Sequence, residues 1–99
     1  MKVIILPGWK HTKDMWSEVA RLFADDGHDV DVIDFPGFDS EPLVSSSMDM
    51  NDYVRWTRDK LHKQLRPKDS VVLVGHSFGG RVAARLAARR PELVRGLIL

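Results

Sequence analysis

One segment of the sequence, Val71–Gly80, constrains the fold more than any other. The apolar run Val71–Val74 leads into Gly75-His76-Ser77-Phe78-Gly79-Gly80, and a pattern typical of an amphipathic helix follows. A strand that passes into a helix over so few residues must reverse sharply at Ser77, and flanking glycines remove side chains that would collide across the turn. The segment therefore predicts a strand, a strained turn and a helix, with Ser77 displayed above a sheet and the first N–H groups of the helix close to it.

Strands and helices alternate along the rest of the chain. Short runs rich in β-branched residues predict strands, and apolar residues at spacings of three and four predict helices between them. We expect strands at residues 3–6, 30–34, 70–74 and 94–99, a first helix capped by Thr12, a second capped by Ser47 or Asp49, and a third starting after Ser77. Helices that link successive strands make those strands parallel, with right-handed crossovers. The predicted fold class is α/β, a single domain over residues 1–99 with a parallel sheet and helices on both faces, in the order βαβαβαβ.

Composition excludes several classes of protein. Apolar residues make up 43% of the chain and charged residues 29%, which is the balance of an ordinary globular domain and not of a disordered one. The chain has no cysteine, so it forms no disulfide and no thiolate metal site. No apolar run approaches the length of a membrane-spanning helix, and no secretory signal follows Met1. We therefore expect a cytoplasmic protein that uses no metal or organic cofactor and has no membrane partner.

Charge is distributed unevenly, although the net charge is only +1. Residues 1–50 contain four basic and ten acidic side chains, whereas residues 51–99 contain eleven basic and four acidic ones. A basic half of this kind can mark a nucleic-acid surface. Here the basic residues are spread over two predicted helices, aromatic residues among them are sparse, and no binding motif accompanies them. We expect no nucleic-acid partner.

The glycines around Ser77 also fit a phosphate-binding loop, which is G-x-x-x-x-G followed by Lys and then Ser or Thr. Arg81 and Val82 occupy those two positions in this chain. Because valine has no oxygen with which to ligate magnesium, we reject nucleotide binding.

Several motifs resemble those of the α/β-hydrolase fold family, and the resemblance extends over nearly the whole chain. Gly75–Gly80 resembles the family's nucleophile elbow, and Asp34–Phe38 resembles its Asp-X-Pro-Gly-X turn. Val3–Trp9 resembles the first central strand and its oxyanion loop, with Pro7 in place of the usual histidine, and residues 94–99 resemble the strand after the elbow. The resemblance implies a strand order of 2-1-3-4, with strands numbered along this chain.

The resemblance also implies roles for individual residues. Ser77 would be the catalytic nucleophile, and the backbone N–H groups of Trp9 and Phe78 would form the oxyanion hole. Gly75, Gly79 and Gly80 would be the glycines of the elbow. The implied function is that of an esterase-like serine hydrolase acting on a small-molecule ester or related acyl substrate.

One departure from the family concerns the rest of the catalytic triad. The family orders its triad as serine, then an acid, then histidine. After Ser77 the chain has a single acid, Glu92, and no histidine. Glu92 follows the helix that runs away from Ser77, so it is expected to lie too far off to act. We therefore expect residues 1–99 to be the N-terminal portion of a longer α/β-hydrolase domain, inactive alone, with the acid and base further along.

Two histidines and one other class of function remain to be weighed. His76 neighbours Ser77 on a tight turn, where the two side chains diverge, so it is not expected to be the base. His11 lies near the oxyanion loop and is expected to be solvated, although it is also placed to line a substrate pocket. The alternative function is that of a non-catalytic half-domain that binds a partner or self-associates, for which the strand at residues 94–99 provides an apolar edge.

Overall fold

The computed structural model describes residues 1–99 and contains one parallel sheet. Its four strands lie in the order β2-β1-β3-β4, and all three neighbouring pairs are parallel. The strands are β1 (Lys2–Leu6), β2 (Asp29–Val32), β3 (Val71–Gly75) and β4 (Val94–Ile98). The α/β class and the strand order 2-1-3-4 are therefore confirmed.

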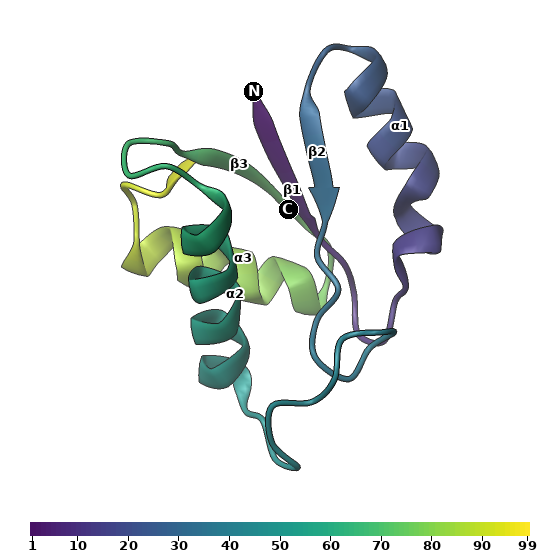
Figure 1. The fold of residues 1–99 in the computed structure, drawn as a ribbon, viewed down its shortest axis with the longest axis vertical. Helices are drawn as coiled ribbons and strands as arrows, with labels where there is room; N and C mark the ends of the chain where they lie inside the picture. Colours follow the sequence, from purple (N-terminus) through teal and green to yellow (C-terminus); the bar gives the residue numbers. More distant parts are fainter.

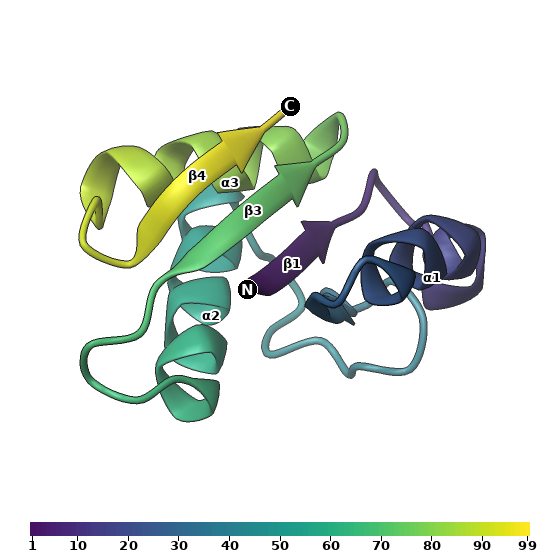
Figure 2. The ribbon, with the colours of Figure 1, turned by 90° about the horizontal axis from the view of Figure 1, so that it is seen from above.

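Helices cover both faces of the sheet, as the crossover rule predicts. They are the 3-10 helix η1 (Lys13–Trp16), α1 (Ser17–Asp25), α2 (Met50–Gln64) and α3 (Phe78–Arg89). The chain steps from β1 outward to β2 in one direction and then through β3 to β4 in the other. Right-handed crossovers consequently place α1 on one face and pack α2 with α3 on the opposite face (Figures 1 and 2).

The main core lies between the sheet and the pair α2 and α3. Alternate residues of β1 and β3 point into it, because successive side chains of a strand face opposite ways. Its fully buried aliphatic members are Ile4, Leu6, Ile33, Leu61, Val71, Leu73, Val82, Ala83 and Leu86. The α1 face is more thinly covered, since α1 contributes no fully buried residue.

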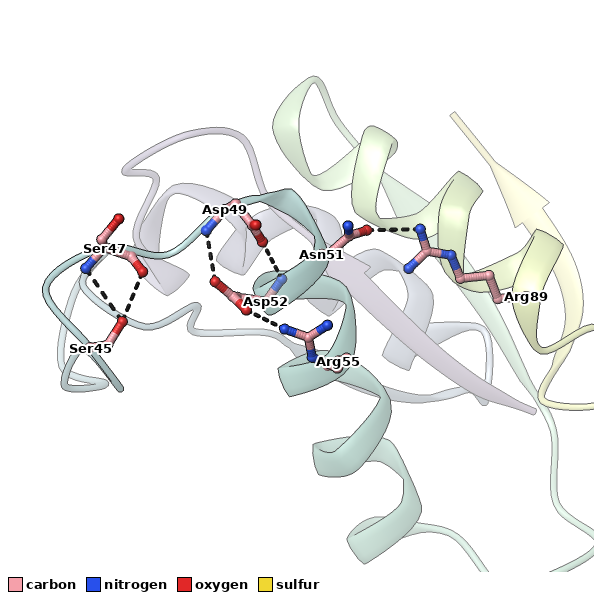
Figure 3. Close-up of polar contacts among 7 residues, drawn as sticks. All are labelled: Ser45, Ser47, Asp49, Asn51, Asp52, Arg55 and Arg89. Atoms are coloured by element: carbon pink, nitrogen blue, oxygen red, sulfur yellow. Dashed lines mark hydrogen bonds and ion pairs between the residues drawn. The ribbon is translucent and has the colours of Figure 1, made fainter.

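The start of α2 is fixed by a reciprocal cap (Figure 3). The Asp49 carboxylate accepts a hydrogen bond from the Asp52 N–H, and the Asp52 carboxylate accepts one from the Asp49 N–H, both at 2.9 Å. The Asp49 N–H, together with the Arg55 guanidinium, holds the pKa of the Asp52 carboxyl below its ordinary value. Of the two predicted caps, the structure therefore selects Asp49. The Ser47 N–H instead bonds to the Ser45 hydroxyl in the preceding loop.

The start of the first helix differs from the prediction. Thr12 occupies the cap position, but its side chain makes no capping hydrogen bond, and the chain first forms the short 3-10 helix η1. The regular helix α1 begins only at Ser17. None of the helices combines the length and the apolar composition needed to span a bilayer.

The register of the two central strands creates a site at the carboxyl ends of the strands. Leu6, the last residue of β1, pairs with Gly75, the last residue of β3. In a parallel sheet, the carboxyl ends of neighbouring strands lie at the same end of the sheet, so the segments that follow them emerge there. The segments that begin at Pro7 and at His76 therefore emerge side by side.

Candidate active site

Ser77 lies at the junction between β3 and α3 in a sparsely populated backbone conformation. Its φ is 52° and its ψ is −113°, and its side chain is exposed. The reversal is held by the His76 N–H, which donates to the Leu6 carbonyl at 3.0 Å, and by the Gly79 N–H, which donates to the His76 carbonyl at 2.9 Å. The strained turn predicted from the glycine spacing is thus present.

Close contacts explain two of the three glycines of the motif. A Cβ on Gly79 would lie 1.9 Å from the Leu6 carbonyl oxygen, and one on Gly75 would lie 2.7 Å from the Gly80 Cα. A Cβ on Gly80 would meet its nearest atom, the Gly75 carbonyl oxygen, only at 3.4 Å, which is ordinary contact. Glycine is therefore required by packing at positions 75 and 79, whereas position 80 has room for a methyl group.

Two backbone N–H groups, one of the residue after Ser77 and one in the loop after β1, are without acceptors in this chain. Phe78 is the first residue of α3, and Trp9 lies in the loop after β1; neither N–H donates a hydrogen bond to another residue. The indole ring of Trp9 packs edge-on against the Phe78 ring, with centroids 5.1 Å apart, so the two segments are in contact. The positive end of the α3 dipole lies at the same place. This arrangement can stabilise a negative charge that develops beside Ser77.

Comparison with known proteins decides the family. The chain matches the family model described as the alpha/beta hydrolase fold over residues 2–99. This chain belongs to the alpha/beta-hydrolase fold family.

The relatives of this alpha/beta hydrolase include esterases. It is 32% identical over 97 residues to the pimeloyl-[acyl-carrier protein] methyl ester esterase of Aeromonas salmonicida, a match that covers 97% of this chain and 35% of the relative. It is 66% identical over 29 residues to the lipase LipV of Mycobacterium tuberculosis, covering 29% of this chain and 11% of the lipase. The thioesterase domain from the curacin biosynthetic pathway superposes with a TM-score of 0.89 at 26% identity, covering 99% of this chain and 35% of that domain. The chain thus spans about a third of the length of the esterase and of the thioesterase domain.

The alpha/beta hydrolase also groups two histidines and a tryptophan beside the elbow. The rings of His11 and His76 stack with centroids 5.7 Å apart, and the Trp16 indole N–H donates to His11 Nδ1 at 3.3 Å. His11 is therefore partly buried and held in place, contrary to the expectation of a solvated loop histidine. Sequence reasoning missed the stacking because no local pattern links these rings.

An open hollow of about 360 Å³ lies beside Ser77. It is lined by the elbow together with Arg81, Arg85 and Leu99. The two arginines lie one turn apart on α3, so they present positive charge beside the serine. The sequence analysis did not predict their place next to Ser77, because it follows from how α3 leaves the elbow.

The surroundings of the Ser77 hydroxyl, of His76 and of Glu92 bear on how Ser77 could be activated. The Ser77 hydroxyl makes no hydrogen bond, and His76, which the sequence did not favour as the base, makes none to it. Glu92 lies beyond the far end of α3, where it lines a separate hollow with His62 and Asp69. No group of three or more metal-ligating side chains occurs among residues 1–99.

Proposed function

We propose that Ser77 is the nucleophile of a serine hydrolase that acts on an ester or related acyl compound. The observation that carries the proposal is the strained backbone of Ser77, with φ 52° and ψ −113°, directly before the unbonded Phe78 N–H at the start of α3. A serine held in this way projects its hydroxyl from the sheet toward a substrate carbonyl. The membership in a family with esterase relatives supports the same chemistry.

The geometry supports a two-step acyl transfer. Ser77 Oγ forms a bond to the carbonyl carbon while its proton passes to a general base, and the carbonyl oxygen becomes an oxyanion. The Trp9 and Phe78 N–H groups donate to that oxygen, and one such donor contributes about 3 kcal/mol in other enzymes. The bond to the leaving alcohol or thiol then breaks as the base returns the proton, and water releases the acyl group from Ser77 by the same steps.

The general base and the acid that orients it belong, in this proposal, outside residues 1–99. The support is that the Ser77 hydroxyl has no hydrogen-bonding partner in this chain and that Glu92 lies beyond the far end of α3. The base must come within hydrogen-bonding reach of Oγ. We place a histidine and a carboxylate in the sequence that accompanies this one in the complete protein.

The substrate in this proposal is a small acyl compound with an apolar acyl part. The relatives include a methyl ester esterase and a thioesterase domain, whose names specify ester and thioester bonds. Beside the elbow, the Trp9 ring packs edge to face on Phe38 and Phe78, and the Phe38 and Phe78 rings are tilted against each other, with centroid distances of 4.9 to 5.5 Å. Such a wall favours an apolar group over a charged one.

A second candidate is a non-catalytic role in association, and one observation favours it. The edge strand β4 exposes 39% of Leu97 and 51% of Ile98, and Leu99 beyond it is 73% exposed. Exposed apolar edge strands pair readily with other chains. This role does not require Ser77, so substitution of the serine separates the two candidates.

The test uses a fluorophosphonate probe and a short-chain nitrophenyl ester with the complete protein. We expect Ser77→Ala to lose labelling and to lower kcat/KM at least about a thousandfold. Ser46→Ala is the matched control, because Ser46 is exposed and makes no hydrogen bond. Labelling that persists in Ser77→Ala would refute the proposal. The same ester offered to residues 1–99 alone tests where the base lies, and Ser77-dependent turnover there would contradict our placement.

A further inference from the structure

Two tight turns meet beside the proposed oxyanion hole. In the first, the His11 N–H donates to the Gly8 carbonyl at 3.0 Å, and in the second, the Phe38 N–H donates to the Phe35 carbonyl at 3.0 Å. The third residue of each turn has a positive φ, 61° for Lys10 and 81° for Gly37. A positive φ at this position is the mark of a type II turn, which favours glycine there. The second turn has the favoured glycine, Gly37, at this position, whereas the first has Lys10.

Lys10 therefore stands in a conformation that its side chain disfavours. Lys10 and Ser77 are the two residues other than glycine with positive φ, and Lys10 directly follows Trp9, whose N–H is a proposed oxyanion donor. A side chain persists in this region only where its surroundings hold it, and such residues gather at functional sites. We therefore expect a specific contact of the Lys10 side chain to stabilise this strained backbone.

The Lys10 ammonium makes that contact with the second turn. Its Nζ donates to the Gly37 carbonyl at 2.9 Å and lies 5.7 Å from the centre of the Trp9 ring. A charge-assisted hydrogen bond and a cation–π contact from one ammonium fix both the side chain and the indole beneath it. The Trp9 ring in turn packs on Phe38, with centroids 4.9 Å apart. The first turn is therefore joined to the second at two points.

The second turn is anchored in the core. Phe35 is fully buried, and the buried Tyr53 hydroxyl donates to the Pro36 carbonyl at 3.3 Å. A Cβ on Gly37 would lie 2.7 Å from the Leu43 side chain, so the far side of this turn is also packed. Through Lys10, the turn that contains the Trp9 N–H contacts the turn at residues 35–38, which is packed against the core.

We propose that Lys10 is a positioning residue, which holds the turn at residues 8–11 against the turn at residues 35–38 and so fixes the direction of the Trp9 N–H. The inference rests on the proposed function of Ser77. A donor lowers the barrier only where its N–H is already aimed at the position that the oxyanion will occupy. Loss of the ammonium should therefore lower kcat and leave KM unchanged.

Four variants of the complete protein test the kinetic role. Lys10→Gly removes the ammonium but suits the positive φ, Lys10→Met removes it and keeps the stem, and Lys10→Arg keeps a cationic donor. Lys13→Met controls for the loss of one nearby charge, because Lys13 is exposed and makes no ion pair. We expect Lys10→Gly and Lys10→Met to lower kcat about tenfold, less than the loss of a whole oxyanion donor. Lys10→Arg should retain most of the parental kcat, and the kcat of Lys13→Met should equal that of the parent.

The glycine variant separates positioning from stability. A left-handed residue changed to glycine loses its backbone strain, so Lys10→Gly should unfold at the same temperature as the parent or above it. If Lys10 served stability alone, kcat would follow the unfolding temperature. A parental kcat in Lys10→Gly would overturn the proposal.

A measurement without turnover keeps this inference distinct from the proposed function. The Gly37 carbonyl belongs to the same peptide group as the Phe38 N–H, so the ¹⁵N resonance of Phe38 reports the bond from Lys10. We expect that resonance to move in Lys10→Met and to stay in Lys13→Met, and an unmoved resonance in both would overturn the inference. If Ser77→Ala retained activity, the proposed function would fail, whereas the Phe38 resonance would still decide whether Lys10 joins the two turns.

Discussion

Gly79 couples the first turn of a helix directly to the end of a strand. Its Cα lies so close to the Leu6 carbonyl that an added Cβ would sit 1.9 Å from the oxygen and 2.5 Å from the oxygen of Pro7. The start of α3 therefore rests on the backbone of β1 with no side chain between them. This contact sets the height of Ser77 above the sheet, since Ser77 is held between β3 and that helix.

The neighbouring glycines allow a matched comparison at single-residue resolution. We expect Gly79→Ala to lower the free energy of unfolding by about 3 kcal/mol or more, because backbone must move to admit the methyl group. Gly80→Ala should be neutral or stabilising, since its Cβ would find 3.4 Å of room and alanine favours the helix. Denaturant unfolding of both variants measures the difference, and equal losses would contradict the packing argument.

At the scale of the elements, the sequence predicted the strands well because their residues carry a strong local signal. Residues 3–6 and 71–74 are apolar and β-branched, as strands covered on both faces must be, and they form β1 and β3. The strand predicted at residues 30–34 instead spans Asp29–Val32. The Ile33 N–H still donates to the Ile5 carbonyl, and the Asp34 carboxylate then accepts from the backbone N–H groups of Ser40 and Glu41, a partnership that strand periodicity does not encode.

Helix starts were harder to predict, because several good capping residues stand close together. Ser47 and Asp49 are both favourable caps by type. Only Asp49 has an acidic residue three positions on, Asp52, whose carboxylate returns the hydrogen bond to complete the capping box.

The cap of α2 yields a prediction at this scale. We expect Asp49→Ala to lower the free energy of unfolding by about 1 kcal/mol, because it removes the acceptor for the Asp52 N–H. Ser47→Ala should have little effect, since the Ser47 hydroxyl caps nothing. Urea unfolding of the two variants at neutral pH gives both values. A loss from Ser47→Ala as large as that from Asp49→Ala would contradict the assignment of the cap.

For the whole molecule, the limits of sequence reasoning follow from distance along the chain. The spacing of Gly75 and Gly79 around Ser77 is local, and it predicted the strained turn. The role proposed for the Trp9 N–H came only from the family resemblance, because nothing near Ser77 in sequence indicates which other loop approaches it. The contacts from Lys10 to Gly37 and from His11 to His76 join separate loops, so only the assembled sheet brings them together.

The sheet as a whole has two edges, and they differ in character. At one edge, β2 alternates Asp29 and Asp31 with valines, so charged residues blunt it. At the other, β4 carries Arg95 as its only charge and exposes Leu97 and Ile98. The second edge is the one suited to pairing with another chain.

We expect the chain of residues 1–99 to self-associate or aggregate through residues 94–99 at micromolar concentration. Unpaired N–H and C=O groups on an apolar edge strand provide a template for a further strand. Leu97→Lys combined with Leu99→Lys should shift the chain toward monomer in sedimentation experiments. Leu22→Lys is the control, because Leu22 is similarly exposed but lies on α1. A monomeric parent chain would show that this edge is shielded.

The contact between Gly79 and Leu6 has a consequence for folding. The two residues lie far apart in the sequence, and their approach requires β1 and β3 to have paired across the long segment between them, a step that loop-closure entropy makes slow. Until then nothing holds Ser77 in its strained conformation, and the chain carries an ordinary serine of low nucleophilicity. If Ser77 is the nucleophile that we propose, it can react only after the native topology has formed, so nascent or partly unfolded chains should be unreactive. In a refolding experiment, the return of probe labelling should follow the pairing of β1 with β3 and not precede it.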